Sequence, residues 1–156
     1  VIIREDLVKD EWLPNTPTML RYKTQVDNDS LYNTPPAYGI YICGKVFKWL
    51  KAQGGLEAMK QRNEEKAQLL YDYLDQSSLF KATARKEDRS IMNVPFITGS
   101  DELDAEFVAE AKKVGIESIK GHRSVGGMRA SIYNAMPKEG VEKLVEFMKE
   151  FEAKHL

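Results

Sequence analysis

A segment rich in cations and glycines is the part of this sequence best suited to bind an anion. It runs from Lys120 to Arg129 with the sequence KGHRSVGGMR, and no acidic residue lies between Glu117 and Glu139. Arginine holds a carboxylate or a phosphate through two parallel hydrogen bonds, and histidine adds a donor whose charge changes near neutral pH. These residue types predict a site for a small ligand with two or three negative charges. The alternative is a solvated turn that carries scattered basic residues.

A second candidate anion site is the segment Asn33-Thr34-Pro35-Pro36. Asparagine or threonine can cap a helix, and proline is tolerated in the first turn because its missing N–H would have no partner there. The free amides and the dipole at a helix N-terminus attract anions. Simple capping is the alternative, and it is the commoner role of such a segment.

The remaining reactive side chains predict neither a catalytic residue nor a metal site. The only cysteine, Cys43, lies in an apolar stretch, where packing is its expected role. The two histidines are His122 and His155, and His155 lies beside the C-terminal residue in a segment expected to fray. One cysteine and two histidines provide little material for a zinc site or a Ser/His/Asp triad.

The composition is that of a globular protein with balanced charge. Of the 156 residues, 42% are hydrophobic and 30% charged, and 23 Lys and Arg against 24 Asp and Glu give a formal net charge of −1. This balance argues against a general nucleic-acid-binding protein. The chain has no apolar run of about 18 residues that would predict a membrane span, and its N-terminus lacks a secretory-signal pattern. With a single cysteine, we expect a reducing, cytoplasmic compartment.

Two domains are predicted, residues 1–53 and 54–156, because the consecutive glycines Gly54-Gly55 free the backbone between them. The first residues, Val1–Ile3, are β-branched and predict a strand already under way, so we expect that the chain was cut from a longer one. The other elements expected before the boundary are an amphipathic helix over 4–13, a short strand over 19–22 and a largely buried helix over 37–51.

The second domain is predicted to be α+β, with a mixed or antiparallel sheet and helices on one face. Apolar residues recur at helical spacing in three segments, and short apolar or alternating runs mark four strands. The last strand follows directly on the cationic segment. The expected order is a helix over 56–76, strands over 79–84 and 91–97, a helix between Ser100 and Gly115, strands over 116–119 and 129–133, and a helix that begins at Pro137.

Three separated motifs resemble those of phosphoserine aminotransferases: DNDSLYNTPP at 27–36, RSIMNVPF at 89–96 and GHRSVGGMRASIYNAMP at 121–137. That family has the fold type I (α/β) architecture of enzymes that use pyridoxal 5′-phosphate (PLP), and it works as a homodimer. It transfers an amino group between L-glutamate and 3-phosphohydroxypyruvate, giving phosphoserine and 2-oxoglutarate. In many bacteria it also serves pyridoxine biosynthesis. The resemblance implies that 1–53 is the tail of the large PLP-binding domain and 54–156 the small C-terminal domain.

The resemblance also implies roles for five residues. Asn33 and Thr34 match the pair that reaches the PLP phosphate across the dimer. His122 and Arg123 match the pair that binds the substrate phosphate, again across the dimer. Arg129 matches the arginine that holds the substrate carboxylate.

The family's catalytic lysine has no counterpart in this sequence. The resemblance covers roughly the C-terminal two-fifths of such an enzyme, and it implies that the Schiff-base lysine lies upstream of Val1. Because PLP chemistry needs that amine, we expect the chain to be inactive alone. The alternative function is a stand-alone small-anion-binding or subunit-interaction module without catalysis. If the helix over 37–51 lacks a large-domain sheet to pack on, its apolar side chains should be partly exposed.

Overall fold

The computed structural model describes all 156 residues, Val1 to Leu156, and consists of two compact units, Val1–Trp49 and Leu50–Leu156. The division lies a few residues before the Gly54-Gly55 pair. The assignment of the first unit to the end of a larger domain remains a prediction. No helix is both long enough and apolar enough to cross a membrane.

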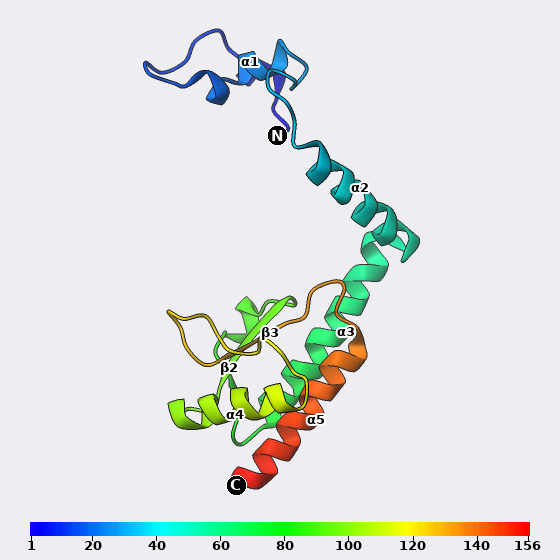
Figure 1. Ribbon diagram of the computed structural model, residues 1–156, viewed down its shortest axis with the longest axis vertical. Coiled ribbons are helices and arrows are strands. Elements are labelled where there is room, and N and C mark those ends of the chain that lie inside the picture. The colour runs from blue at the N-terminus through cyan, green and yellow to red at the C-terminus, as the bar shows by residue number, and fades with distance from the viewer. The chain divides into compact units, whose positions relative to one another are not determined.

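The first unit contains little regular structure before its last helix (Figure 1). It has two 3₁₀ turns, η1 (Glu5–Leu7) and η2 (Thr18–Leu20), followed by the short helix α1 (Tyr22–Val26). The strand predicted over Val1–Ile3 is absent, because a strand needs a neighbour for its backbone hydrogen bonds and this unit contains none. The helix predicted over 4–13 is reduced to η1, and the strand predicted over 19–22 is replaced by η2 and the start of α1.

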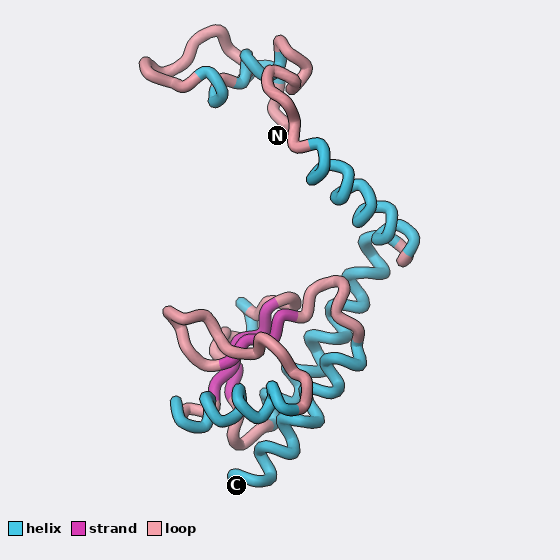
Figure 2. Tube along the Cα trace, viewed as in Figure 1, coloured by secondary structure: helices cyan, strands magenta, loops and turns pink.

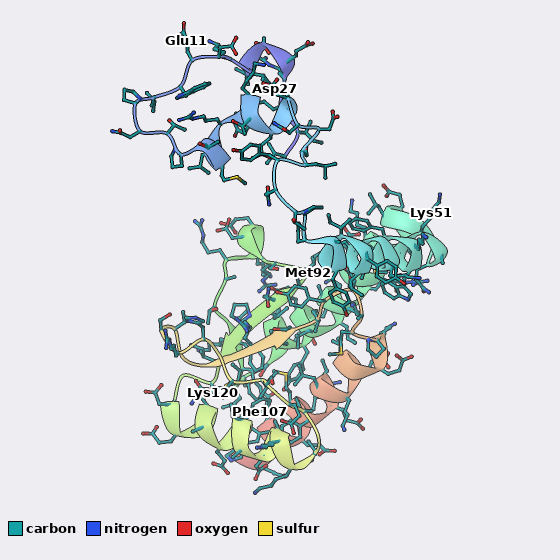
Figure 3. The ribbon with its side chains drawn as sticks, turned by 45° about the horizontal axis from the view of Figure 1, so that its top comes forward. Glu11, Asp27, Lys51, Met92, Phe107 and Lys120 are labelled. Atoms are coloured by element: carbon teal, nitrogen blue, oxygen red, sulfur yellow. The ribbon has the colours of Figure 1, made fainter.

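Helix α2 (Ala37–Ala52) was predicted correctly in extent, but none of its residues is buried. Tyr38 is 78% exposed, and Phe47 is 65% exposed. Cys43, which was expected to pack, is exposed as well. In Figure 3 the side chains near Lys51 project outward from the helix. The prediction of a largely buried helix is wrong for the chain as it stands, whereas partial exposure of this apolar face is confirmed.

The second unit is an antiparallel three-stranded sheet with helices on one face, as predicted (Figures 1 and 2). The strand order is β1-β2-β3. A fourth strand, predicted over 116–119, is absent because Ser118 has a φ of 59°, which interrupts an extended backbone. The elements are α3 (Gly55–Gln76), β1 (Lys81–Ala82), η3 (Lys86–Asp88), β2 (Asn93–Ile97), α4 (Asp101–Lys113), β3 (Met128–Ser131) and α5 (Lys138–His155).

The core of this unit is built around a cluster of phenylalanines between the sheet and the helices. Phe107 of α4 lies edge-on to Phe80, with ring centroids 5.1 Å apart, and edge-on to Phe151 of α5 at 5.2 Å. Phe96 of β2 completes the group, 6.0 Å from Phe107. All four side chains are fully buried. Edge-to-face aromatic pairs add about 0.5–1.5 kcal/mol beyond the burial of their area.

Helices α3 and α5 run side by side, and each holds a neighbouring loop through hydrogen bonds of one side chain: Lys66 in the middle of α3 and Glu152 near the C-terminal end of α5. Lys66 of α3 is 3% exposed, and its ammonium donates to the carbonyl oxygens of Ile132, Tyr133 and Met136 at 3.2, 2.8 and 2.9 Å. The Glu152 carboxylate of α5 accepts from the Tyr73 hydroxyl at 2.5 Å and from the backbone amides of the turn after α3.

The C-terminal end of α5 is ordered by packing, contrary to the expectation that His155 would fray. The imidazole of His155 stacks on Phe151 with ring centroids 4.1 Å apart. Its Nδ1 lies 2.8 Å from the Phe151 carbonyl oxygen, and its Nε2 lies 3.4 Å from a Glu106 carboxylate oxygen.

Residues of β3 alternate between the core and the uncovered face of the sheet. Met128 and Ala130 are buried among the helices, whereas Arg129 and Ser131 are exposed on the other side. Since side chains alternate along a strand, the core contacts of Met128 and Ala130 determine the face on which Arg129 lies.

Candidate anion-binding site

The cationic loop, residues 120–127, leaves the core after Ile119 and returns as β3. Backbone hydrogen bonds close its base: the Gly121 amide donates to the Gly127 carbonyl at 2.8 Å, and the Arg129 amide donates to the Ile119 carbonyl at 2.7 Å. Lys120 at its start is labelled in Figure 3. Within the loop, the amides of residues 125 and 126 both donate to the His122 carbonyl oxygen, at 2.9 and 2.8 Å. The two residues proposed to bind phosphate therefore lie on a closed loop.

Two glycines are required for this closure. A Cβ on Gly121 would lie 2.0 Å from the Gly126 carbonyl oxygen, which no side chain can accommodate. Gly127 has a φ of 63°, and a Cβ there would lie 2.6 Å from Ile97 Cγ2 and 2.9 Å from the Phe96 carbonyl oxygen. The loop thus lies directly against the end of β2.

A cavity of about 490 Å³ lies between the cationic loop and the start of α4. Lys120, His122 and Arg123 supply its basic groups. Asp101 and Asp104 of α4 supply acidic ones. Asp104 is 8% exposed, and one of its carboxylate oxygens accepts from the Thr98 amide at 2.8 Å and the Thr98 hydroxyl at 2.7 Å. This carboxylate therefore stabilises the turn before α4 through these hydrogen bonds.

No cation of this region has an acidic partner. Lys120, His122, Arg123 and Arg129 form no ion pair within 4.0 Å, although other basic residues of the same unit, such as Arg89 with Asp75, do. Several exposed lysines elsewhere are also unpaired, so the feature that distinguishes this group is its concentration on one loop and the adjoining strand. An anionic ligand would supply the missing countercharge.

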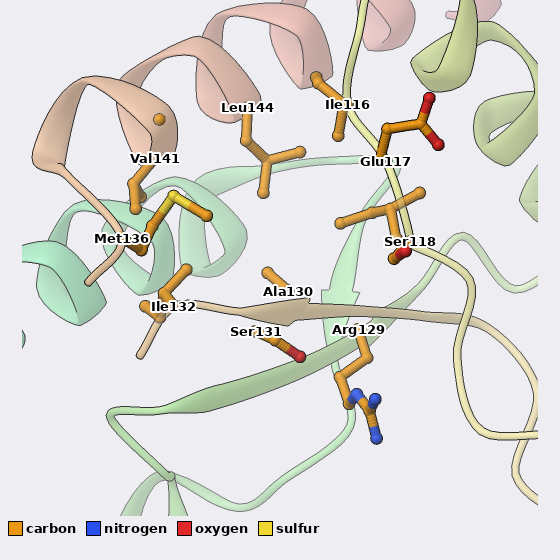
Figure 4. Close-up of a pocket in the computed structure, with 12 residues that line it drawn as sticks. Ile116, Glu117, Ser118, Arg129, Ala130, Ser131, Ile132, Met136, Val141 and Leu144 are labelled. Atoms are coloured by element: carbon orange, nitrogen blue, oxygen red, sulfur yellow. The ribbon is translucent and has the colours of Figure 1, made fainter. Parts of the chain in front are cut away.

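Arg129 lies on the uncovered face of the sheet, opposite Pro95 of β2. Figure 4 shows its guanidinium on the side of β3 away from Val141 and Leu144. These two residues and Arg129 itself are among those that line a cavity of about 240 Å³ beneath α5. That cavity is lined mainly by apolar groups and is unsuited to an anion. The structure therefore brings His122 and Arg123 into one cavity and places Arg129 on the adjoining strand, outside that cavity.

Asn33 and Thr34 lie in the first unit, just before α2. Both are exposed, and the Asn33 side-chain amide donates to the Thr34 carbonyl at 3.1 Å. The Ala37 amide donates to the Pro35 carbonyl at 2.8 Å, and the first i→i−4 hydrogen bond of the helix runs from the Ile40 amide to the Pro36 carbonyl at 3.1 Å. The backbone amides of residues 38 and 39 therefore have no acceptor. Such amides, with a hydroxyl and an amide side chain beside them, suit a phosphate.

Sequence reasoning missed Ser124, whose hydroxyl lies 2.7 Å from His122 Nδ1. The His-x-Ser spacing was a usable signal, because a serine two residues on can bond back to a neighbouring polar group. It also missed Lys66, which shares the buried face of α3 with Met59, Asn63 and Leu70. The available signal was the position of Lys66 seven residues after Met59 and four before Leu70, a spacing that places it on the apolar face of the helix.

Comparisons with known proteins agree on one family. The sequence matches the family described as aminotransferase class-V over residues 11–144. It is 57% identical over 152 residues to a protein of Streptococcus suis named phosphoserine aminotransferase, covering 97% of this chain and 41% of that protein. The protein of the same name from Nitrosomonas europaea is 57% identical over 155 residues, covering 99% and 42%.

Solved structures give the same result. A phosphoserine aminotransferase from Bacillus circulans subsp. alkalophilus superimposes with a TM-score of 0.90 at 50% identity, over 99% of this chain and 43% of the other. A PLP-bound phosphoserine aminotransferase from Trichomonas vaginalis gives a TM-score of 0.85 at 40% identity, over 94% and 42%. The chain spans about two-fifths of the length of the relatives it matches.

Proposed function

Because the chain belongs to the class-V aminotransferases, we propose that it corresponds to the C-terminal part of a phosphoserine aminotransferase. The whole enzyme would transfer an amino group between L-glutamate and 3-phosphohydroxypyruvate in the cytoplasm. This reaction would serve serine biosynthesis and, in many bacteria, the enzyme would also serve pyridoxine biosynthesis. The observation that carries this proposal is the cationic loop, which brings His122 and Arg123 to one cavity while neither forms an ion pair.

The substrate's charges match the cations of this region. 3-Phosphohydroxypyruvate has a phosphate at one end and a carboxylate at the other. His122 and Arg123, on a loop closed by backbone hydrogen bonds, would bind the phosphate. Arg129, on the uncovered face of β3, would hold the carboxylate in a two-point contact. Glutamate lacks the phosphate, so its recognition would depend on Arg129 and less on the loop.

The residues before α2 fit the phosphate end of PLP. The Thr34 hydroxyl, the Asn33 side-chain amide and the free backbone amides of residues 38 and 39 in α2 would hold that group through hydrogen bonds and the helix dipole. When bound, PLP supplies the electron sink that amino-group transfer requires. We assign no residue of this chain as the lysine that binds its aldehyde, and for this reason we do not expect the chain to transaminate by itself.

We also propose that the enzyme works as a homodimer, because Asn33, Thr34, His122 and Arg123 match residues that act across the dimer in the family, and that α2 packs on a part of the whole enzyme outside this chain. Exposed apolar residues cluster on α2, among them Tyr38, Ile40 and Phe47, at 78%, 60% and 65% exposure. A surface of this kind is uncommon on a monomer and is typical of a face that packs against another part of a protein. The Asn33-Thr34 pair lies at the start of the same helix, so burial of this face and binding of the cofactor phosphate would be linked.

The test is the substitution Arg123→Ala in the whole enzyme, with the two half-reactions measured separately. Loss of one charge-assisted contact of about 1.5–3 kcal/mol should lower kcat/KM for the phosphorylated substrate by about 10- to 100-fold. kcat/KM for glutamate should change much less. Arg62→Ala on α3, which removes an exposed arginine remote from the loop, is the matched control and should leave both values unchanged.

Equal losses for the two half-reactions would contradict a phosphate role for Arg123. A whole protein that binds inorganic phosphate through Arg123 but shows no transaminase activity would instead favour the alternative function, a small-anion-binding module.

A further inference from the structure

His122 is held by its neighbour in a way that assigns one of its ring nitrogens. The Ser124 amide N–H points at His122 Nδ1 at 3.3 Å, and the Ser124 hydroxyl lies 2.7 Å from the same nitrogen. A backbone N–H can only donate, so Nδ1 must be the acceptor. The proton of the neutral ring then resides on Nε2.

We propose that Ser124 is a positioning residue that keeps His122 in the Nε2–H tautomer, so that this N–H is available to the phosphate of the substrate. In the opposite tautomer Nε2 would present a lone pair, which repels an anion instead of donating to it. The inference rests on the proposed function for the identity of the ligand, but the tautomer itself is a property of the free protein.

The loop that carries this pair is formed without a ligand. The His122 carbonyl accepts from two amides of the same loop, and the Gly121 amide closes the base onto Gly127. These bonds determine the backbone positions of residues 122 to 124, so the ring and the serine meet without assistance from a substrate. A site prepared in this way loses less conformational entropy when the anion binds.

The second histidine of the chain provides an internal control. His155 Nδ1 lies 2.8 Å from the Phe151 carbonyl oxygen, which can only accept, so this ring must have a proton on Nδ1. The two histidines are therefore expected to show opposite protonation at Nδ1. One spectrum can report both.

The experiment is nitrogen-15 NMR on the whole enzyme made with ¹⁵N-labelled histidine, recorded without substrate at about pH 8.5, where an ordinary histidine is neutral. The spectra of His122→Gln and His155→Gln assign the two rings. We expect an unprotonated Nδ1 in His122 and a protonated Nδ1 in His155. A protonated Nδ1 in His122 overturns the inference, whatever the enzyme's substrate.

The variant Ser124→Ala tests the role of the serine. It removes the hydroxyl and leaves the backbone amide, so part of His122 should convert to the Nδ1–H tautomer. kcat/KM for the phosphorylated substrate should fall by about three- to tenfold, as expected for one neutral hydrogen bond, with little change for glutamate. Ser124→Thr, which keeps the hydroxyl, should restore both the tautomer and the rate. Ser78→Ala, at an exposed serine of another turn, is the matched control.

The outcomes separate the two proposals. An unchanged tautomer in Ser124→Ala overturns the positioning role of the serine. A changed tautomer with unchanged kinetics for the phosphorylated substrate overturns the link to phosphate. If Arg123→Ala is then also without effect, the proposed function fails while the tautomer assignment stands.

Discussion

At the scale of single residues, Arg129 shows how a strand presents a ligand-binding group. Its backbone amide donates a hydrogen bond to the Ile119 carbonyl, and its neighbours Met128 and Ala130 are buried. Its guanidinium is exposed on the uncovered face of the sheet and forms no ion pair. The backbone is therefore rigid while the charge remains free. We expect a ligand carboxylate to be the group that neutralises it.

Substitution of Arg129 by alanine in the whole enzyme should lower kcat/KM for both glutamate and the phosphorylated keto acid by about 10- to 100-fold, because both carry the carboxylate that this arginine would hold. Arg129→Lys keeps the charge but loses the planar fork, so it should recover only part of the loss. Steady-state kinetics of both half-reactions measure the effect. A loss confined to one substrate would argue against a common carboxylate contact.

The site residues could be proposed from the sequence because the basic residues are close together in the chain and lack acidic neighbours. His122, Arg123 and Arg129 fall within one short segment, and the loop joins them without long-range contacts. The hydrogen bond between Ser124 and His122 was harder to predict from the sequence, because it depends on the turn geometry that Gly121 and Gly127 allow.

At the scale of elements, the helices were easier to predict than the strands. Helices α2, α3, α4 and α5 lie close to their predicted limits because their apolar spacing and end signals are local. The strands that form are shorter than predicted, and three are absent. Those over Val1–Ile3 and 19–22 have no neighbouring strand to pair with, and the one over 116–119 is interrupted at Ser118. Lys66 illustrates what sequence cannot show: its three carbonyl partners lie far along the chain, in the loop before α5.

Glu152 is the residue through which α5 holds the turn after α3. Burial raises the pKa of its carboxyl, but hydrogen bonds from the Tyr73 hydroxyl and the amides of Ser78 and Leu79 outweigh burial, so the pKa lies below its ordinary value. A carboxyl with a lowered folded-state pKa contributes stability above its unfolded-state pKa and loses it as the pH falls through the folded-state value.

The substitution Glu152→Gln should therefore lower the free energy of unfolding by about 1–2 kcal/mol at neutral pH. The difference from the unsubstituted protein should narrow below about pH 4, where the carboxyl becomes protonated. Urea unfolding at several pH values measures both effects. Glu150→Gln, at the exposed position two residues earlier, is the control and should show neither. A difference that stays constant with pH would contradict the assigned cause.

At the scale of the whole chain, the two units differ in how completely each buries its apolar side chains. Every hydrophobic residue of the buried core, from Met59 to Phe151, belongs to the second unit. In the first unit no helix contains a buried residue. Since burial of apolar area is the main source of stability, the second unit should fold by itself and the first should depend on other contacts.

Amide hydrogen exchange on the 156-residue chain tests this difference. Amides of residues 1–49 should exchange orders of magnitude faster than those of α3, α5 and β2, because opening of the first unit disrupts little buried area. The same residues within the whole enzyme are the control, and there α2 should be protected. Equal protection of both units in the isolated chain would show that the first unit has stabilising contacts of its own.

The alternation of β3 limits how the length of this region can change during evolution. A one-residue insertion or deletion that shifted the register of β3 would turn Arg129 toward the phenylalanine cluster and Met128 toward solvent. The base of the loop cannot accommodate the change either, because the Gly121 amide donates to the Gly127 carbonyl there and the Arg129 amide donates to the Ile119 carbonyl. Amino-acid replacements are therefore tolerable at the exposed Val125, whereas a change in the number of residues is not. Among homologous genes, in-frame indels should be rare here and should accumulate instead in stretches such as that between β1 and β2.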